Sequence, residues 1–355
     1  KNISKETLLD AIEQSLIQAY KNHFGKADNV HVTINRETGD FSVYADRKVV
    51  EFVEDPAEEV SLVEAQKQNT NAEVGDILKV PVHSDKFGRI ATQNAKNVIL
   101  QKIREEERKV LFDQYHGNEK EVVTGIVQRV VGHNVSVNLG KADAILAENE
   151  QVKGETFKPT ERIKVYILEV KDTPKGPRIL VSRTHPGLVK RLFESEVAEV
   201  KDGTVEIKSI AREAGSRTKL AVWSNDPDVD PVGACVGVNG ARVSAIVNEL
   251  RGEKIDIINW DENPAILIEN ALSPAKVIAV MADPDEKTAL VVVPDYQLSL
   301  AIGKEGQNAR LAARLTGFKI DIKSETQARE SGDFYDYDED DDEYYEDDEY
   351  EESEE

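Results

Sequence analysis

The stretches GVNGARVSAIVNELRGEKIDI (237–257) and GKEGQNARLAARLTGFKIDI (303–322) are two copies of one pattern, and they decide the fold. Each copy begins with Gly-x-x-Gly, continues as a helical run with apolar residues three or four positions apart, and is stopped by a glycine. The string Lys-Ile-Asp-Ile begins 14 residues after the last glycine of the loop in one copy and 13 in the other. Strand-like runs precede the loops, at 219–223 and 289–293. The repeat therefore predicts two successive α+β units.

The Gly-x-x-Gly loops have the chemistry of a clamp for a nucleic-acid backbone. Glycine has no Cβ to push a phosphate away, and the helix that follows points its first N–H groups at the same place. KH domains hold about four nucleotides in this way. The predicted RNA-binding residues are those of the two loops and the arginines that follow them: Gly237, Val238, Asn239, Gly240, Arg242, Gly303, Lys304, Glu305, Gly306, Arg310 and Arg314. The alternative is that the glycines only form tight turns between helices and that the arginines are solvated helix surface.

The acidic charge of the chain is concentrated at one end. The 355 residues hold 45 Lys and Arg against 68 Asp and Glu, a formal net charge of −23. Residues 333–355 carry 16 of these acidic residues and no Lys or Arg, which leaves 52 acidic against 45 basic residues, or −7, for the rest. That segment also lacks Leu, Ile and Val, so it predicts a disordered tail that serves solubility or competes with nucleic acid for basic surfaces. The acidic balance therefore does not exclude RNA as a ligand.

Other features of the composition exclude whole classes of protein. The single cysteine, Cys235, excludes a disulfide framework within the chain and fits a reducing cytoplasm. The longest apolar runs are far shorter than the ~18–20 residues that span a bilayer, and the first residues lack the apolar core of a signal peptide. The histidines are dispersed, without zinc-ligand spacing. We therefore expect a cytoplasmic protein without a membrane segment, metal or cofactor.

The first part of the chain predicts an α+β domain with a connecting helix. A helix over 4–24 starts at Ser4 and stops at Gly25, and strand-like runs follow at 30–34, 41–45 and 49–53. The turn between the first two strands is predicted at 37–40, and Asp55-Pro56 is expected to end the sheet. A long helix over 94–115 has a narrow apolar stripe, as bridging helices have, and an expected Glu105–Lys109 pair.

The segment 121–183 predicts a small closed β-barrel of the OB type. Strand-like runs occupy 122–130, 135–139, 142–146, 162–170 and 178–183, with glycines between them. Its only aromatic residues are Phe157 and Tyr166, with His133 besides. Because stacking on aromatic side chains contributes roughly 1–3 kcal/mol per base to single-strand binding, we expect this barrel alone to bind RNA weakly.

The order of these parts resembles the NusA family of bacterial transcription termination/antitermination factors, in its short Gram-positive form with an acidic tail. The strings that carry the resemblance are FGRIATQNAKNVILQKIREEER (87–108), ILVSRTHPGLVKRLFESEV (179–197), SIAREAGSRTKLAV (209–222), DPVGACVG (230–237), VNELRGEKIDIINW (247–260) and AIGKEGQNARLAARLTGFKIDI (301–322). The resemblance implies a multidomain α+β protein in five parts: an N-terminal RNA polymerase-binding domain (1–118), an S1 barrel (119–185), two tandem KH domains of prokaryotic type (186–262 and 263–328) and the disordered acidic tail (329–355).

The resemblance also implies a function and partners. Members are not enzymes; they bind RNA polymerase at the flap of its β subunit, meet nascent single-stranded RNA and hairpins, and work with other elongation and antitermination factors. They promote pausing and hairpin-dependent termination. We expect a monomer tethered to polymerase, with Arg89 and Arg104 as candidate polymerase contacts. In this chain Val238-Asn239 lacks the basic residue that the first loop usually has in the family.

Two other functions compete with this one. Exoribonucleases such as polynucleotide phosphorylase also carry S1 and KH modules, but in the opposite order and after a catalytic core, and residues 1–115 show no catalytic constellation. An RNA-binding protein of RNA turnover or RNA chaperoning, acting without polymerase, is the other alternative. Co-purification with polymerase and a phosphorolysis assay separate the three.

Overall fold

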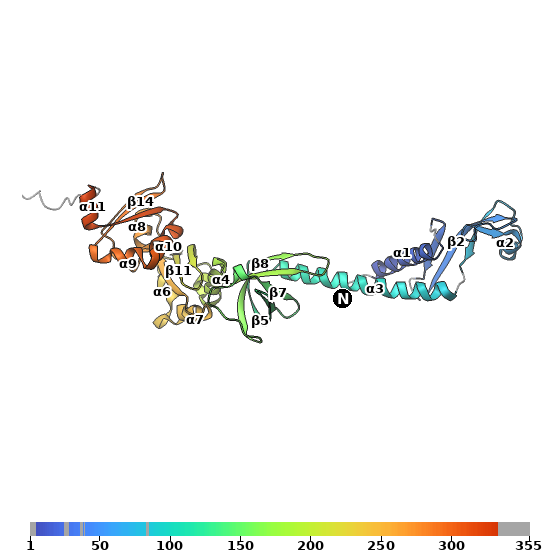
Figure 1. Cartoon of the computed structure of the whole chain (residues 1–355), viewed down its shortest axis with the longest axis horizontal. Coiled ribbons are helices and arrows are strands. Elements are labelled where there is room, and N and C mark those ends of the chain that lie inside the picture. Colours follow the sequence, from blue (N-terminus) through green and yellow to red (C-terminus); the bar gives the residue numbers. More distant parts are fainter. Residues whose placement is uncertain (1–4, 25–27, 36–37, 39, 83–84, 333–355) are drawn as a thin grey trace, which may run out of the picture. The chain divides into compact units, whose positions relative to one another are not determined.

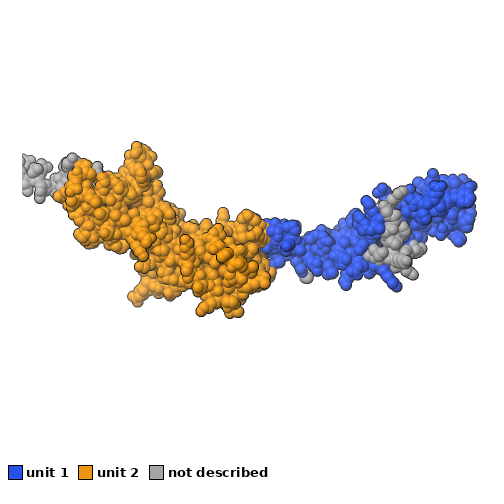
Figure 2. All heavy atoms as spheres, viewed as in Figure 1, with its two compact units in different colours: residues 1–114, 172–177 blue, residues 115–171, 178–355 orange. Residues whose placement is uncertain are grey.

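The computed structural model describes residues 5–24, 28–35, 38, 40–82 and 85–332 (Figure 1). It divides into two compact units, residues 1–114 with 172–177 and residues 115–171 with 178–355 (Figure 2). The predicted cap at Ser4, the helix stop at Gly25, most of the turn at 37–40 and the tail from 333 onward lie outside the described residues.

The first unit packs one helix on a four-stranded sheet. Helix α1 (Lys5–Phe24) buries its apolar stripe, including Leu16 and Tyr20, against β1 (Val30–Ile34) and β2 (Phe41–Val50). The two strands are antiparallel, as the sequence predicts. Strand β2 runs without interruption to Val50, so the separate strand predicted at 49–53 does not exist.

The expectation that Asp55-Pro56 ends the sheet is wrong. Strand β3 (Glu59–Ser61) pairs with β2 in parallel, and β4 (Ile77–Pro81) pairs with it antiparallel. Asp55 forms a turn instead, because its side chain accepts from the Ala57 N–H and its carbonyl accepts from the Glu59 N–H. Helix α2 (Leu62–Gln68), capped by the Ser61 hydroxyl, connects β3 to β4 and was not predicted.

The long helix α3 (Asp85–His116) is confirmed, and it begins nine residues earlier than predicted. Glu105 pairs with Lys102 at 3.0 Å instead of the expected Lys109. The hydrogen bonds from Gln101 and Lys102 lower the pKa of the Glu105 carboxyl. The candidate polymerase contacts Arg89 and Arg104 both lie exposed on this helix.

The five predicted strands of the middle segment form a closed barrel. They are β5 (Val122–Val131), β6 (Asn134–Asn138), β7 (Asp143–Leu146), β8 (Arg162–Lys171) and β9 (Arg178–Ser182), in the order β5-β6-β7-β9-β8. Alternate residues such as Val137 and Val165 are fully buried inside it. Gly125 permits the closure, because a Cβ there would lie 2.3 Å from Cγ1 of Val137.

The repeat in the sequence is a repeat in the structure. The first copy (186–262) consists of α4 (Pro186–Glu196), α5 (Ala198–Lys201), β10 (Val205–Glu213), β11 (Arg217–Ser224), α6 (Pro231–Val236), α7 (Ala241–Glu249) and β12 (Lys254–Asn259). The second copy (263–328) consists of α8 (Pro264–Ala271), β13 (Ala279–Asp283), β14 (Thr288–Val293), α9 (Leu298–Ile302), α10 (Gln307–Thr316), β15 (Lys319–Ser324) and the start of α11 (Glu325–Ser331). The disordered tail was predicted from residue 329, but residues 329–331 are helical, because Ser324 and Gln327 cap the start of α11. In each copy the middle strand pairs antiparallel with the first strand and parallel with the last.

The sheet of the first copy is buried on both faces. Along β11, Leu220 and Val222 contribute to the core beneath α4 and α7, whereas Ala221 between them contributes to a second core with α8 and α10 of the other copy. Alternate residues of a strand face opposite sides of the sheet, and here both sides are buried. The strand is therefore a continuous apolar run in the sequence. The two copies therefore share one hydrophobic core.

A buried arginine of the barrel and a more exposed ion pair join the barrel to the first copy. Arg183, 1% exposed, donates two hydrogen bonds of 2.7 Å to the buried Glu155 and two more to the carbonyls of Lys164 and Glu249. Arg251 adds an exposed pair with Glu161 at 2.9 Å. The barrel and the first copy are thus connected by charged side chains as well as by the chain itself.

His185 gives this junction a pH dependence. It stacks on Tyr166 with ring centroids 4.7 Å apart, and its Nδ1 accepts from the Gly187 N–H at 3.0 Å. Burial, helped by Arg212 and opposed by Glu150, lowers the pKa of His185 below its ordinary value near 6.5. As the pH falls, His185 takes up a proton in the unfolded chain before it does so in the folded chain. The contribution of neutral His185 to the stability of the fold is therefore complete above the ordinary pKa and is lost below it.

We therefore expect the melting temperature to fall between pH values of about 7.5 and about 5.5, and to fall less in His185→Asn. Asparagine keeps an acceptor for the Gly187 N–H but has no group that titrates in this range. Differential scanning fluorimetry of both proteins across the range is the measurement. An equal fall in the two proteins would contradict the assignment to His185.

Candidate nucleic-acid interface

The two Gly-x-x-Gly loops follow the same backbone path. In the first loop (237–240), Gly237 has φ/ψ of 75°/171°, Asn239 52°/26° and Gly240 73°/17°. In the second loop (303–306), Gly303 has 77°/172°, Glu305 53°/27° and Gly306 73°/15°. Three of four residues in each loop thus have positive φ, which side-chain-bearing residues rarely adopt. Two unrelated turns would not agree this closely, so the loops are equivalent elements.

The first and the last glycine of each loop differ in what a side chain at their position would contact. A Cβ on Gly237 would lie 2.8 Å from Cγ of Arg242, and one on Gly303 would lie 2.8 Å from the Asn308 backbone nitrogen, so the first glycine is needed for packing. The nearest side-chain atom to a Cβ on Gly240 or Gly306 is 3.9 or 3.8 Å away. A side chain on these last glycines would therefore meet only ordinary van der Waals contacts, so packing does not require glycine there, and their positive φ is the reason that the fold itself gives for it.

The loop residues between the glycines are exposed, and only one of them is basic. Val238 is 84% exposed, and Asn239, Lys304 and Glu305 are exposed as well. Helices α7 and α10 begin directly after the loops. The favourable groups for a phosphate are therefore the N–H groups at these helix starts together with Lys304.

The three predicted arginines are engaged with protein groups. Arg242 lies behind the first loop, where its Nη1 donates to Glu199 at 3.0 Å and to the Ala234 carbonyl at 2.6 Å. Arg310 donates to Glu213 at 2.7 Å, and Arg314 lies 3.9 Å from the same carboxylate. Any phosphate bound by these arginines competes with those carboxylates, so their role in RNA binding stays a prediction.

The second loop is attached to the first copy. The Gln307 side chain donates to Glu213 and to the Ser216 hydroxyl, both at 2.8 Å. The hydrogen bonds from Arg310 and Gln307 lower the pKa of the Glu213 carboxyl. These contacts fix the start of α10 against the turn between β10 and β11.

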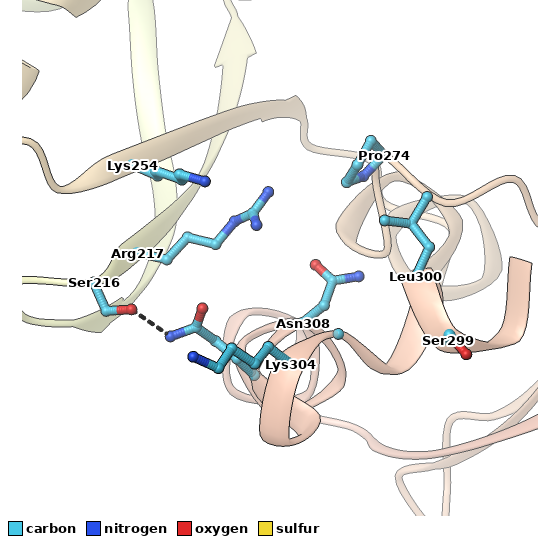
Figure 3. A pocket seen from close by; sticks show the side chains of 10 residues that line it. Ser216, Arg217, Lys254, Pro274, Ser299, Leu300, Lys304 and Asn308 are labelled. Atoms are coloured by element: carbon cyan, nitrogen blue, oxygen red, sulfur yellow. Dashed lines mark hydrogen bonds between the residues drawn. The ribbon is translucent and has the colours of Figure 1, made fainter.

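A cavity of about 370 Å³ lies beside this attachment (Figure 3). The first copy lines it with Ser216, Arg217 and Lys254, and the second copy lines it with Pro274, Ser299, Leu300, Gly303, Lys304, Gln307 and Asn308. Of these residues, only Gly303 and Lys304 were among the predicted RNA-binding residues. Lys254 begins the repeated Lys-Ile-Asp-Ile string, yet only the packing of the two copies shows that it faces the second loop.

The aromatic residues of the barrel are occupied. Tyr166 is 7% exposed and stacks on His185, and Arg251 lies over the Phe157 ring with its guanidinium carbon 5.3 Å from the ring centroid. His133 is exposed near Glu148, with Nδ1 and the carboxylate 3.6 Å apart. Weak binding by the barrel alone stays a prediction, and it is supported by the burial of Tyr166 and by the position of Arg251 over the half-buried Phe157 ring.

The described part of the chain has neither a membrane-spanning helix nor a cluster of metal-ligating side chains. No described helix has both the length and the apolarity to cross a membrane. Within the same residues, no group of three or more His, Cys, Asp or Glu side chains is placed to hold a metal ion.

Comparison with known proteins assigns the parts of the chain. Family models match it as NusA N-terminal domain (1–109), S1 RNA binding domain (117–182), NusA-like first KH domain (183–260) and NusA-like second KH domain (264–330). The S1 and KH descriptions are those of RNA-binding domains, and the closed barrel and paired repeats described above are their folds.

Curated relatives match nearly the whole chain. The transcription termination/antitermination protein NusA of Bacillus subtilis is 57% identical over 332 residues, covering 94% of this chain and 90% of that protein. The NusA protein of Halalkalibacterium halodurans is 55% identical, covering 94% and 87%. The solution structure of the B. subtilis NusA N-terminal domain is 48% identical over 30% of this chain and 87% of that one, with a TM-score of 0.25. These relatives are transcription factors and not enzymes, and this chain belongs to the NusA family of transcription termination/antitermination proteins.

Proposed function

We propose that this protein binds RNA polymerase through residues 1–118, with Arg89 and Arg104 among the contacts, and holds its S1 and KH domains on the nascent transcript. It promotes pausing and hairpin-dependent termination and takes part in antitermination with other elongation factors. The polymerase site is the flap of the β subunit. The names of the curated relatives support the termination and antitermination roles.

The observation that carries the RNA-binding part is the pair of matched loops. A Cβ on Gly240 or Gly306 would have no contact shorter than 3.8 Å, and helices begin directly behind the loops. Because the two copies share a core, the loops are held in one rigid body and can contact one RNA strand. The predicted contacts are the eight loop residues with Arg242, Arg310 and Arg314.

Tethering explains how modules of low charge act on RNA. The chain without residues 333–355 has a formal charge of −7, and the arginines near the loops are paired with carboxylates. Electrostatic attraction to RNA is therefore weak. Attachment to polymerase makes RNA binding intramolecular, which raises the local concentration of the transcript to the millimolar range for a short connection.

A transcription assay on a template with a defined hairpin pause tests the tethering. We expect residues 119–355 to bind RNA like the full chain but to need at least about 100-fold more protein for the same pause lifetime. The full-length variant Arg89→Glu/Arg104→Glu tests the same attachment without truncation and should reduce co-purification with polymerase. Full pausing by residues 119–355 at the concentration of the full chain would rule out tethering.

A further inference from the structure

The cavity between the two KH domains contains a buried hydrogen-bond acceptor without a partner among the described residues. Asn308 is 3% exposed, and its Nδ2 donates to the carbonyls of Leu272 and Ala301, both at 3.0 Å, which fixes the orientation of the amide. Its Oδ1 is buried and accepts no hydrogen bond. Figure 3 shows this oxygen turned into the hollow, on the side where Arg217 lies. An unpaired buried acceptor costs about 1–3 kcal/mol, so the position favours a ligand that brings a donor.

The same cavity favours an anion. Lys254 and Lys304 line it from opposite domains, and both are exposed. Arg217 also lines it and uses Nε and Nη2 to bind Asp256, at 2.6 and 2.9 Å. The nearby carboxylate of Glu213 is already paired with Arg310. The cations of the cavity thus exceed its anions.

A bare anion satisfies the lysines but leaves Asn308 unpaired, because a phosphodiester carries no hydrogen-bond donor. One ribonucleotide of an RNA strand satisfies both. Its 2′-hydroxyl is attached to the carbon next to the one that bears the 3′ phosphate, so the donor and the negative charge arrive together. The cavity of about 370 Å³ is also within the ~300–1,000 Å³ range of small-ligand sites.

We propose that this cavity is a ribonucleotide subsite in which Lys254 and Lys304 bind the phosphate and Asn308 Oδ1 accepts from the ribose 2′-hydroxyl. Asn308 then determines the preference for RNA over DNA, since the 2′-hydroxyl is the group that distinguishes them. The inference rests on the proposed RNA binding by the KH domains and adds to it the position at which the sugar is read.

The test replaces one 2′-hydroxyl at a time. Fluorescence anisotropy of the full chain is measured with mixed-sequence RNA strands of about 12 nucleotides, long enough for two domains that each take about four, each strand carrying a single 2′-deoxy position. We expect one position to weaken binding about tenfold, as the loss of one such hydrogen bond implies, and the others to change it little. No variant at Asn308 is required, which matters because its Nδ2 bonds support the fold.

Two lysine variants complete the design. In Lys254→Ala the 2′-deoxy substitution at that one position should no longer weaken RNA binding, because the nucleotide is no longer held there. Lys319→Ala is the matched control: Lys319 begins the same Lys-Ile-Asp-Ile string in the second copy, is exposed, and is not among the residues lining the cavity. In Lys319→Ala the same 2′-deoxy substitution should still weaken RNA binding.

The outcomes distinguish failure of the subsite from failure of the proposed RNA binding. RNA binding with no position-dependent 2′-deoxy effect, or an effect unchanged in Lys254→Ala, overturns the subsite. No RNA binding at all refutes the proposed function itself.

Discussion

The variant Gly240→Asp/Gly306→Asp is expected to lose at least about 100-fold in RNA affinity, because a hydrogen bond to a charged group contributes about 1.5–3 kcal/mol and both loops lose one. A Cβ on either glycine meets only ordinary van der Waals contacts, so an aspartate fits there, and its carboxylate is expected to repel the phosphate. Aspartate also tolerates the left-handed backbone of these positions better than most residues. The fold should therefore survive the substitution, and the loss should reflect binding.

The matched control is Gly240→Asn/Gly306→Asn. Asparagine has the shape and the backbone tolerance of aspartate without its charge, so this variant measures the cost of a side chain alone and should bind RNA better than the aspartate variant. Anisotropy with single-stranded RNA gives the affinities, and circular dichroism verifies the fold. Aspartate loops that bind as tightly as the native loops would show that these glycines are turn formers and no clamp.

The second large effect is on stability, at Arg183. Replacing it with leucine leaves the Glu155 carboxylate buried without its partner, and breaking a buried ion pair in this way costs about 3–5 kcal/mol. It also leaves the carbonyls of Lys164 and Glu249 without a donor. We expect the barrel and the first KH domain to unfold at markedly lower urea concentration.

The double variant Arg183→Leu/Glu155→Leu separates the pair from its surroundings. It removes both charges, and apolar replacement of a whole buried pair is often neutral. We therefore expect it to recover much of the stability that the single variant loses. If Arg183→Leu alone unfolds at the native urea concentration, the ion pair does not stabilise the junction.

The sequence predicted the elements whose signals are local. The barrel strands alternate apolar and polar residues, and the repeated loops are marked by glycines at fixed spacing, so their bounds were close to those observed. The N-terminal sheet was predicted less well. Strand β3 has only three residues and pairs with β2 in parallel after the Asp55 turn, and so short a run has no periodicity to detect.

The candidate site could be predicted only in part, for a similar reason. The loops are contiguous in sequence and were found. Lys254 and Asn308 meet across the cavity only because α10 packs on the sheet of the other KH domain, and Glu213 takes up Arg310 for the same reason. A pattern along one chain indicates that an arginine follows a loop, but not that a carboxylate 97 residues earlier is its partner.

The core that the two KH domains share also bears on how the repeat unfolds. Helix α10 covers β10 and β11, so separating the domains exposes Ala221 and Leu311 to water at once, and neither domain keeps a complete interior alone. Opening of the pair is therefore expected to be cooperative, with amide protons of β11 and β14 exchanging in one event. Because each copy supplies part of the shared core, deleting either copy is expected to destabilise the one that remains.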